Sequence, residues 1–97
     1  MILNYIVWYP SFMATKLLDI AKKMPKMPSY VKKWQILQTA DGKKGIKQYN
    51  IIHIEKGHGE EAIVDISHMF KPFVDHERIE AKLEVLIGVK DSMKIMA

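Results

Sequence analysis

The sequence predicts an α+β fold in which six elements follow one another as strand, helix, strand, strand, helix and strand. Two segments carry apolar residues at intervals of three and four, which is the period of a helix with one buried face. Four other segments are rich in β-branched and aromatic residues, and proline, glycine and aspartate separate them. A chain of 97 residues is the size of one domain with one core.

The first strand is expected over residues 2–9, and Pro10 ends it. Its side chains alternate between two faces, and apolar residues stand on both of them. A strand of this kind is covered on both sides in the folded protein. Ser11 follows the proline and is a suitable N-cap for the helix that comes next.

Two amphipathic helices are expected, over residues 12–24 and 60–71. The apolar stripe of the first is formed by Met13, Leu17, Ile20, Ala21 and Met24. The stripe of the second is formed by Ala62, Ile63, Ile66, Met69 and Phe70. Pro25 stops the first helix, and Pro72 bends or ends the second.

Three further strands are expected from their apolar and β-branched content, over residues 30–39, 46–55 and 79–89. Asp41 and Gly42 begin a hairpin turn that reaches Gly45 and joins the first two of these strands. The last strand alternates between apolar and polar side chains. Residues 90–97 have the spacing of a short amphipathic turn.

The composition excludes several classes of protein. The chain has no cysteine, so it holds neither a disulfide nor a thiolate metal site. Its N-terminal segment lacks the basic residues and cleavage site of a signal peptide. No apolar run approaches the about 20 residues of a membrane helix. We therefore expect a cytoplasmic protein that makes no contact with a membrane and has no cofactor.

The net charge of +4 is unevenly distributed along the chain. Residues 11–47 hold nine lysines against two aspartates, a balance of +7, whereas residues 48–97 hold six basic and nine acidic groups, a balance of −3. Such a division is typical of a lysine-rich solvated surface, of a site for an anionic partner, or of two copies of a chain that attract each other.

The order of the elements predicts a ferredoxin-like βαββαβ sandwich with a four-stranded antiparallel sheet. Three short segments carry a closer resemblance: Val7-Trp8-Tyr9-Pro10, the stretch from Phe70 to Asp75, and Val89-Lys90-Asp91. Together with the layout they resemble the dimeric α/β-barrel group of ferredoxin-like proteins, and most of all a family of unassigned function within it. The resemblance spans nearly the whole chain.

The resemblance implies a homodimer in which two sheets pack face to face across a two-fold axis. Other members of the group are antibiotic-biosynthesis-type monooxygenases, muconolactone isomerases and stress-responsive barrel proteins. Haem-degrading members use an asparagine, a tryptophan and a histidine in that order. Asn4 suits the first position, but the second-helix region contains no tryptophan and Trp34 lies near the second strand. We therefore do not predict haem degradation.

His53 is the best candidate for a catalytic residue. It falls in the third strand on the face of Tyr49, Ile51 and Glu55. Burial beside a carboxylate would tune its pKa for proton transfer. The alternative is a structural histidine at the edge of the core, with both ring nitrogens hydrogen-bonded.

Polar and aromatic residues within the apolar strands are candidates for ligand binding. Buried amides need partners and can orient a small ligand, and aromatic rings can line an apolar cavity. The candidates are Asn4, Tyr5, Trp8, Tyr49 and Asn50, with Gln48 and Trp34 as further members of the two classes. The alternative is that the amides pair with each other or face solvent and that the rings are ordinary core or interface residues.

Two other kinds of site receive less support. Glu61, Asp65 and His68 share a helix face with the spacing of metal ligands, but that face opposes the apolar stripe, and we predict no metal site. Nucleic-acid binding would use six lysines: Lys22, Lys23, Lys32, Lys33, Lys43 and Lys44. The third strand lacks the aromatic pair of an RNA-recognition sheet, and the chain has a single arginine, so nucleic acid is not the partner we expect.

Three functions are consistent with these residues. The first is a homodimeric protein that binds a small apolar or aromatic ligand or acts as an accessory module. The second is a cofactor-independent enzyme of the monooxygenase or isomerase kind, with a pocket between sheet and helices, His53 as base and Tyr49 or Asn50 as orienting groups. The third is a nonspecific nucleic-acid binder.

Overall fold

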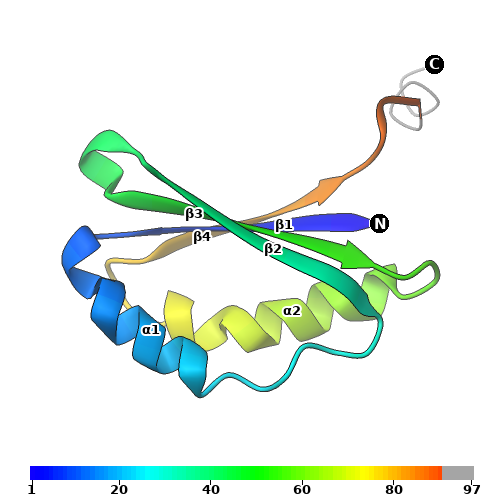
Figure 1. Cartoon of the computed structure of the whole chain (residues 1–97), viewed down its shortest axis with the longest axis horizontal. Helices are drawn as coiled ribbons and strands as arrows, with labels where there is room; N and C mark the ends of the chain where they lie inside the picture. The colour runs from blue at the N-terminus through cyan, green and yellow to red at the C-terminus, as the bar shows by residue number, and fades with distance from the viewer. Residues whose placement is uncertain (91–97) are drawn as a thin grey trace.

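A computed structural model describes residues 1–90 and has an α+β architecture, with an open four-stranded antiparallel sheet and two helices on one of its faces (Figure 1). The strands are β1 (Ile2–Tyr9), β2 (Val31–Ala40), β3 (Ile46–Ile54) and β4 (Glu80–Leu86). The helices are α1 (Ala14–Lys22) and α2 (Gly59–Val74). The predicted α+β class is therefore confirmed, and residues 1–90 contain the four strands and two α-helices expected there.

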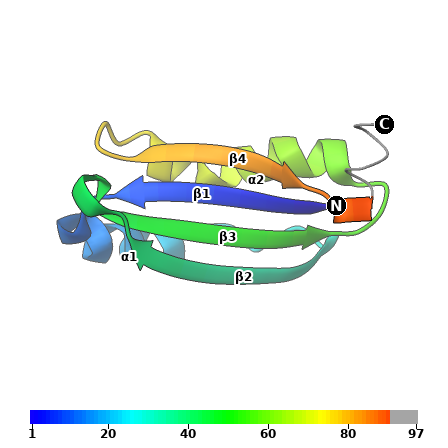
Figure 2. The same cartoon turned by 90° about the horizontal axis from the view of Figure 1, so that it is seen from above.

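The strands lie in the order β2-β3-β1-β4, so β1 occupies the interior of the sheet between β3 and β4 (Figure 2). Tyr5 stands opposite Asn50 of β3 and Leu83 of β4. Both neighbours of β1 run antiparallel to it, as does β2 to β3.

The alternation of side chains gives β1 two different faces. Leu3, Tyr5, Val7 and Tyr9 face the helices and belong to the hydrophobic core. The side chains of Asn4, Ile6 and Trp8 project from the other face, which we call the open face because neither α1 nor α2 covers it (Figure 1). The expectation that β1 is covered on both sides is thus met on one side within residues 1–90.

The first helix is shorter than the sequence predicted. Ser11–Met13 form a 3-10 turn, and α1 ends at Lys22, three residues before Pro25. Ser11 lies inside the 3-10 turn, and no side-chain hydrogen bond caps the start of that turn or of α1. The prediction that Ser11 caps the helix was therefore wrong.

The second helix is longer than predicted and runs through Pro72 to Val74. A proline in the last turn removes only one helical hydrogen bond, and Phe73 is buried in the core, which favours continuation of the helix. The last strand ends at Leu86, earlier than predicted. The amphipathic turn expected at the C-terminus falls largely on residues 91–97, outside the described part of the chain.

The core lies between the sheet and the helices. Its largest fully buried apolar side chains are Leu3 of β1, Ile52 of β3 and Ile66 of α2. Asn50 is equally buried and lies at the floor of this layer. The helix α2 contributes five buried residues and α1 only one, so α1 leaves part of the sheet less tightly covered.

Candidate ligand-binding cavity

A cavity of about 310 Å³ lies where α1 covers the sheet less tightly. Strands β1, β2 and β3 form its floor, and α1 and the C-terminal half of α2 form its walls. Its volume is at the lower end of the range of about 300–1,000 Å³ for small-molecule sites. The lining residues are Val7, Tyr9, Ala14, Leu17, Leu18, Ala21, Met24, Trp34, Ile36, Gln38, Gln48, Asn50, Phe70 and Phe73.

Aromatic rings hold the wall at α2 in place. Phe70 stacks on Tyr5 with ring centroids 4.3 Å apart. It also makes a T-shaped contact with Trp34, and the centroids of these two rings are 6.5 Å apart. Phe73 packs one turn further along the helix, at 5.7 Å from Phe70. These contacts make one rigid apolar surface from β1, β2 and α2, and such surfaces bind planar apolar molecules.

The opposite part of the cavity is the more open. Leu18 of α1 is 56% exposed, and Trp34 and Ile36 of β2 are 38% and 50% exposed. All three side chains line the cavity. The mouth between α1 and β2 is therefore apolar and accessible, which is the arrangement a ligand needs in order to enter.

A connected set of polar groups crosses the floor. Gln38 of β2 stands directly opposite Gln48 of β3, and Asn50 follows Gln48 on the same face. The Tyr9 hydroxyl donates to Gln38 Oε1 at 2.5 Å, and Gln48 Nε2 donates to the same oxygen at 3.3 Å. Asn50 Nδ2 donates to Gln48 Oε1 at 3.1 Å, so the four side chains form one network.

Asn50 joins this network to the rest of the sheet. Its Nδ2 donates to the carbonyl oxygen of Tyr5 at 3.0 Å, and its Oδ1 accepts from Trp34 Nε1 at 3.0 Å. A fully buried amide with three bonds of this kind is held in one orientation. The polar floor is therefore preorganised.

The cavity is electrostatically neutral. Among the described residues that line it there is no aspartate, glutamate, lysine, arginine or histidine, and Tyr9 is the one titratable side chain. Burial raises the pKa of Tyr9 above its ordinary value, and burial likewise raises the pKa of Tyr5 behind the wall. Both phenols are therefore neutral hydrogen-bonding groups at physiological pH.

The structure divides the predicted ligand-binding residues between the two faces of the sheet. Asn50 lines the cavity, and Tyr5 supports it through its carbonyl oxygen and its stack on Phe70. Asn4, Trp8 and Tyr49 lie on the open face. Gln48 and Trp34 line the cavity as well.

The proposed base His53 also lies on the open face, opposite Ile2 of β1 and Lys33 of β2. It shares this face with Tyr49 but not with Asn50, whose side chain points to the helices. His53 is therefore not among the residues that line the cavity, and the three groups suggested for an enzyme site do not converge on it.

Trp8 is the centre of a second polar cluster, on the open face. Its Nε1 donates to Asp41 Oδ2 at 2.8 Å, and the ammonium groups of Lys44 and Lys47 lie 5.3 and 5.4 Å from its ring. Lys47 also lies 4.9 Å from the ring of Tyr49. These contacts anchor the β2–β3 turn to β1 and keep the Lys47 stem along the aromatic surface.

Asn4 is buried on the same face. Its Nδ2 donates to Glu84 Oε1 at 3.2 Å, while its Oδ1 has no hydrogen-bond partner within residues 1–90. A buried acceptor without a donor is costly, and a donor from outside the described chain would satisfy it.

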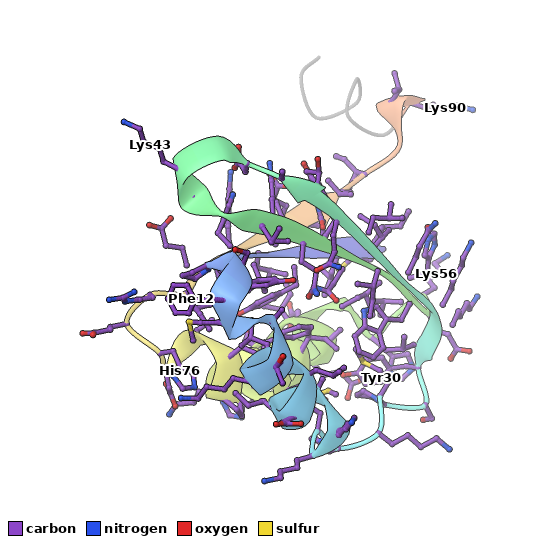
Figure 3. The ribbon with its side chains drawn as sticks, turned by 60° about the vertical axis from the view of Figure 1, so that its left-hand side comes forward. Phe12, Tyr30, Lys43, Lys56, His76 and Lys90 are labelled. Carbon is purple, nitrogen blue, oxygen red and sulfur yellow. The ribbon has the colours of Figure 1, made fainter. Side chains whose placement is uncertain are left out.

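Two of the three residues weighed as metal ligands, Glu61 and Asp65, make other contacts. Asp65 accepts a hydrogen bond from the Tyr30 hydroxyl at 2.7 Å, and Glu61 pairs with His58 Nδ1. Figure 3 shows Tyr30 beside the lower end of β2, in the layer between sheet and helices. Residues 1–90 contain no group of three or more histidine or acidic side chains with the geometry of a metal site.

The lysines proposed for nucleic acid are spread over distant parts of the molecule. Lys32 and Lys33 lie near the start of β2, and Lys43 and Lys44 follow its end, at a separation of roughly 30 Å along an extended strand. Figure 3 shows Lys43 at the tip of the turn, pointing away from the sheet.

Two members of the floor, Tyr9 and Gln38, were absent from the predicted site. The sequence contained a signal for Gln38. The predicted turn runs from Asp41 to Gly45, so Lys43 is its middle residue. In a hairpin centred on Lys43, each residue before it pairs with the residue the same number of positions after it. This pairing places Gln38 opposite Gln48 and Ile36 opposite Asn50, as the structure shows. Tyr9 could not be assigned in this way, because its contact with Gln38 crosses from β1 past β3 to β2.

No protein-family model, curated protein or solved structure matches this chain. Within residues 1–90 there is no helix with the length and apolar character needed to cross a membrane.

Proposed function

We propose that this protein binds one small, largely apolar or aromatic ligand in the cavity between its sheet and its helices. The observation that carries the proposal is the combination of an accessible apolar mouth with a fixed polar floor in a cavity of about 310 Å³. Ligand sites have this anatomy, with many apolar contacts and a few convergent polar groups.

The lining favours binding over proton transfer. A general acid or base works best when its pKa is near the operating pH, and burial moves the pKa of Tyr9 further from neutrality. His53 lies on the other side of the sheet. An isomerase or monooxygenase reaction in this cavity would have to rely on the ligand's own reactivity and on orientation by the amides.

Equilibrium dialysis with 2-ethylnaphthalene tests the proposal. We expect saturable uptake of one molecule per chain. The substitution Ala21→Phe places a ring at the mouth from an exposed position and should abolish uptake, whereas Ala40→Phe makes the same change at an exposed β2 residue outside the lining. Uptake that does not saturate, or that survives Ala21→Phe unchanged, would refute binding in this cavity.

We further propose that the chain is a ferredoxin-like protein that assembles as a homodimer through the open face, in the manner of the dimeric α/β barrels. The order of elements and the strand order β2-β3-β1-β4 support this fold. The open face carries apolar side chains on all four strands, and Leu37 of β2 and Leu86 of β4 are 50% and 37% exposed. Exposed apolar surface of this kind is typical of a protein–protein interface.

Charge and the path of β4 favour a second copy as the partner of this face. Lys33 and Lys47 stand on the β2–β3 half, and on the β4 half Glu80 and Glu84 outnumber Lys82, which pairs with Glu84 at 3.4 Å. A two-fold axis along the strands would therefore place the acidic half of one copy over the basic half of the other. Beyond β4 the chain leaves the sheet, as Figure 1 shows, with Ile87 and Val89 46% and 79% exposed. A donor across this interface would also satisfy Asn4 Oδ1, which has no hydrogen-bond partner within residues 1–90.

A further inference from the structure

We infer that the ligand of this cavity is a neutral molecule with a hydrogen-bond acceptor oxygen, such as a ketone, ester or amide carbonyl, on an apolar body. This inference rests on the proposed function and names the ligand class for the same site. It follows from the orientation of the three floor amides and from the absence of charge in the described lining.

The orientation of the first amide is fixed from outside the cavity. A backbone carbonyl can only accept a hydrogen bond and an indole nitrogen can only donate one. The carbonyl oxygen of Tyr5 therefore requires the Nδ2 of Asn50, and Trp34 Nε1 requires its Oδ1. Exchange of the two ends of Asn50 would break both bonds.

The orientation of Asn50 fixes the orientation of the Gln48 amide, and Gln48 in turn fixes that of Gln38. Because Asn50 Nδ2 donates to Gln48, the atom of Gln48 that it meets is Oε1, and Gln48 presents Nε2 to Gln38. Gln38 must then accept through Oε1, which also accepts from the Tyr9 hydroxyl. The network therefore runs in one direction and ends with the Nε2 of Gln38.

At its end the network leaves amide N–H groups without an acceptor among the described residues. All three amide oxygens are engaged, and the hydroxyl proton of Tyr9 is committed to Gln38. No hydrogen bond within residues 1–90 uses Gln38 Nε2, and Gln48 Nε2 keeps one of its two hydrogens. A ligand that reaches this floor meets N–H groups, and an acceptor oxygen is the complement to them.

The charge of the ligand follows from the lining. An anion would satisfy the N–H groups, but it would lose its hydration with no cation in the described lining to compensate. Lys44 and Lys47, which lie in and just after the β2–β3 turn, stand against Trp8 on the open face. A neutral carbonyl offers the same acceptor without this cost.

The test compares three ligands of one shape by equilibrium dialysis: 2-ethylnaphthalene, 2-acetylnaphthalene and 2-naphthoate. One hydrogen bond contributes about 0.5–1.5 kcal/mol, so the ketone should bind about 2- to 12-fold more tightly than the ethyl compound. The carboxylate should bind at least about tenfold more weakly than the ketone at neutral pH, since it must give up its hydration.

A pair of variants assigns the preference to the floor. Gln38→Met removes the terminal donor and should reduce the ketone's advantage to about one, while Gln35→Met changes the opposite face of β2 and should leave it intact. Equal binding of ketone and ethyl compound, a preference that survives Gln38→Met, or tightest binding of the carboxylate would overturn the inference and leave the proposed function standing. Failure of all three ligands to bind saturably would refute the proposed function itself.

Discussion

Asn50 is the residue on which the cavity floor depends most. It is fully buried, and its amide makes three hydrogen bonds to β1, β2 and β3. The sequence marked it as a polar residue within an apolar strand, which is why we predicted it as a ligand-binding residue, and the structure places it in the lining of the cavity. Its partners were not predictable, because they depend on which strand face turns towards the helices.

The substitution Asn50→Asp should lower the free energy of unfolding by about 3 kcal/mol at neutral pH, because a carboxylate cannot donate to the Tyr5 carbonyl and would be a buried charge. Urea denaturation measures the change. Val64→Asp introduces a carboxylate at an exposed position on α2, away from the cavity and the open face, and should alter stability by less than about 0.5 kcal/mol. Equal effects from the two substitutions would contradict the network.

We expect the folded chain to lose stability in alkaline solution because of Tyr30. Burial, the hydrogen bond to Asp65 and the charges of Asp65 and Glu61 raise the pKa of Tyr30 above its ordinary value. The folded chain therefore holds the phenolic proton more tightly than the unfolded chain. This stabilisation is complete below about pH 10, where the unfolded phenol titrates, and is lost as pH rises towards the folded-state pKa.

Tyr30→Phe should lower the free energy of unfolding by about 2 kcal/mol at neutral pH, because the hydrogen bond to Asp65 is lost. It should also make the decline above about pH 10 shallower than in the natural chain. Denaturation at a series of pH values measures both effects. A decline of unchanged slope would show that Tyr30 does not retain its proton in the folded state.

At the scale of elements, the observed ends of the strands and helices show where tertiary packing outweighed the local sequence preference. The first strand was predicted at its observed bounds, because Pro10 ends it and its apolar content is continuous. Pro72 was expected to bend or end α2, yet the helix reaches Val74 because burial of Phe73 outweighs one missing hydrogen bond. Local propensity set the order of the elements, and tertiary contacts set their ends.

The turn between β2 and β3 provides a test at this scale. Gly45 has φ +85°, and a Cβ there would overlap the carbonyl oxygen of Tyr9 and lie 3.1 Å from the Cα of Pro10. Gly42 has φ +53° and open space around it. Gly45→Ala should therefore cost at least about 3 kcal/mol of stability, and Gly42→Ala only about 1 kcal/mol from backbone strain.

Thermal or chemical denaturation of the two variants decides the comparison. If both glycines tolerate alanine equally, the close approach of the turn to the end of β1 is incorrect, and with it the placement of Tyr9 beside Gln38.

At the scale of the whole molecule, the two faces of the sheet have separate proposed roles. The helix-facing side holds the cavity, and the open face is the proposed dimer interface. The sequence predicted apolar residues on both faces of β1 but could not say which face held a pocket, since period-two alternation is symmetric between faces. This is why Asn4, Trp8 and Tyr49 were grouped with Asn50, from which the sheet separates them.

Ile51→Lys tests the dimer. Ile51 lies in the middle of the open face, opposite Asn4 and Gln35, so a lysine there would bury an unpaired charge in the interface. Sedimentation equilibrium should show the natural chain as a dimer and the variant as a folded monomer, with at least about a hundredfold weaker association. Val64→Lys, on the exposed side of α2, should remain dimeric. A natural chain that is monomeric at high concentration would refute the assembly.

The most direct test of the cavity is a two-dimensional NMR titration with 2-acetylnaphthalene that follows the two indole N–H signals. The chain has two tryptophans, Trp34 in the cavity and Trp8 on the open face. Because Trp34 Nε1 donates to Asn50, a ligand on the floor should shift the Trp34 signal in a saturable way and leave the Trp8 signal in place. A shift of Trp8 alone, or of neither indole, would contradict ligand binding between the sheet and the helices.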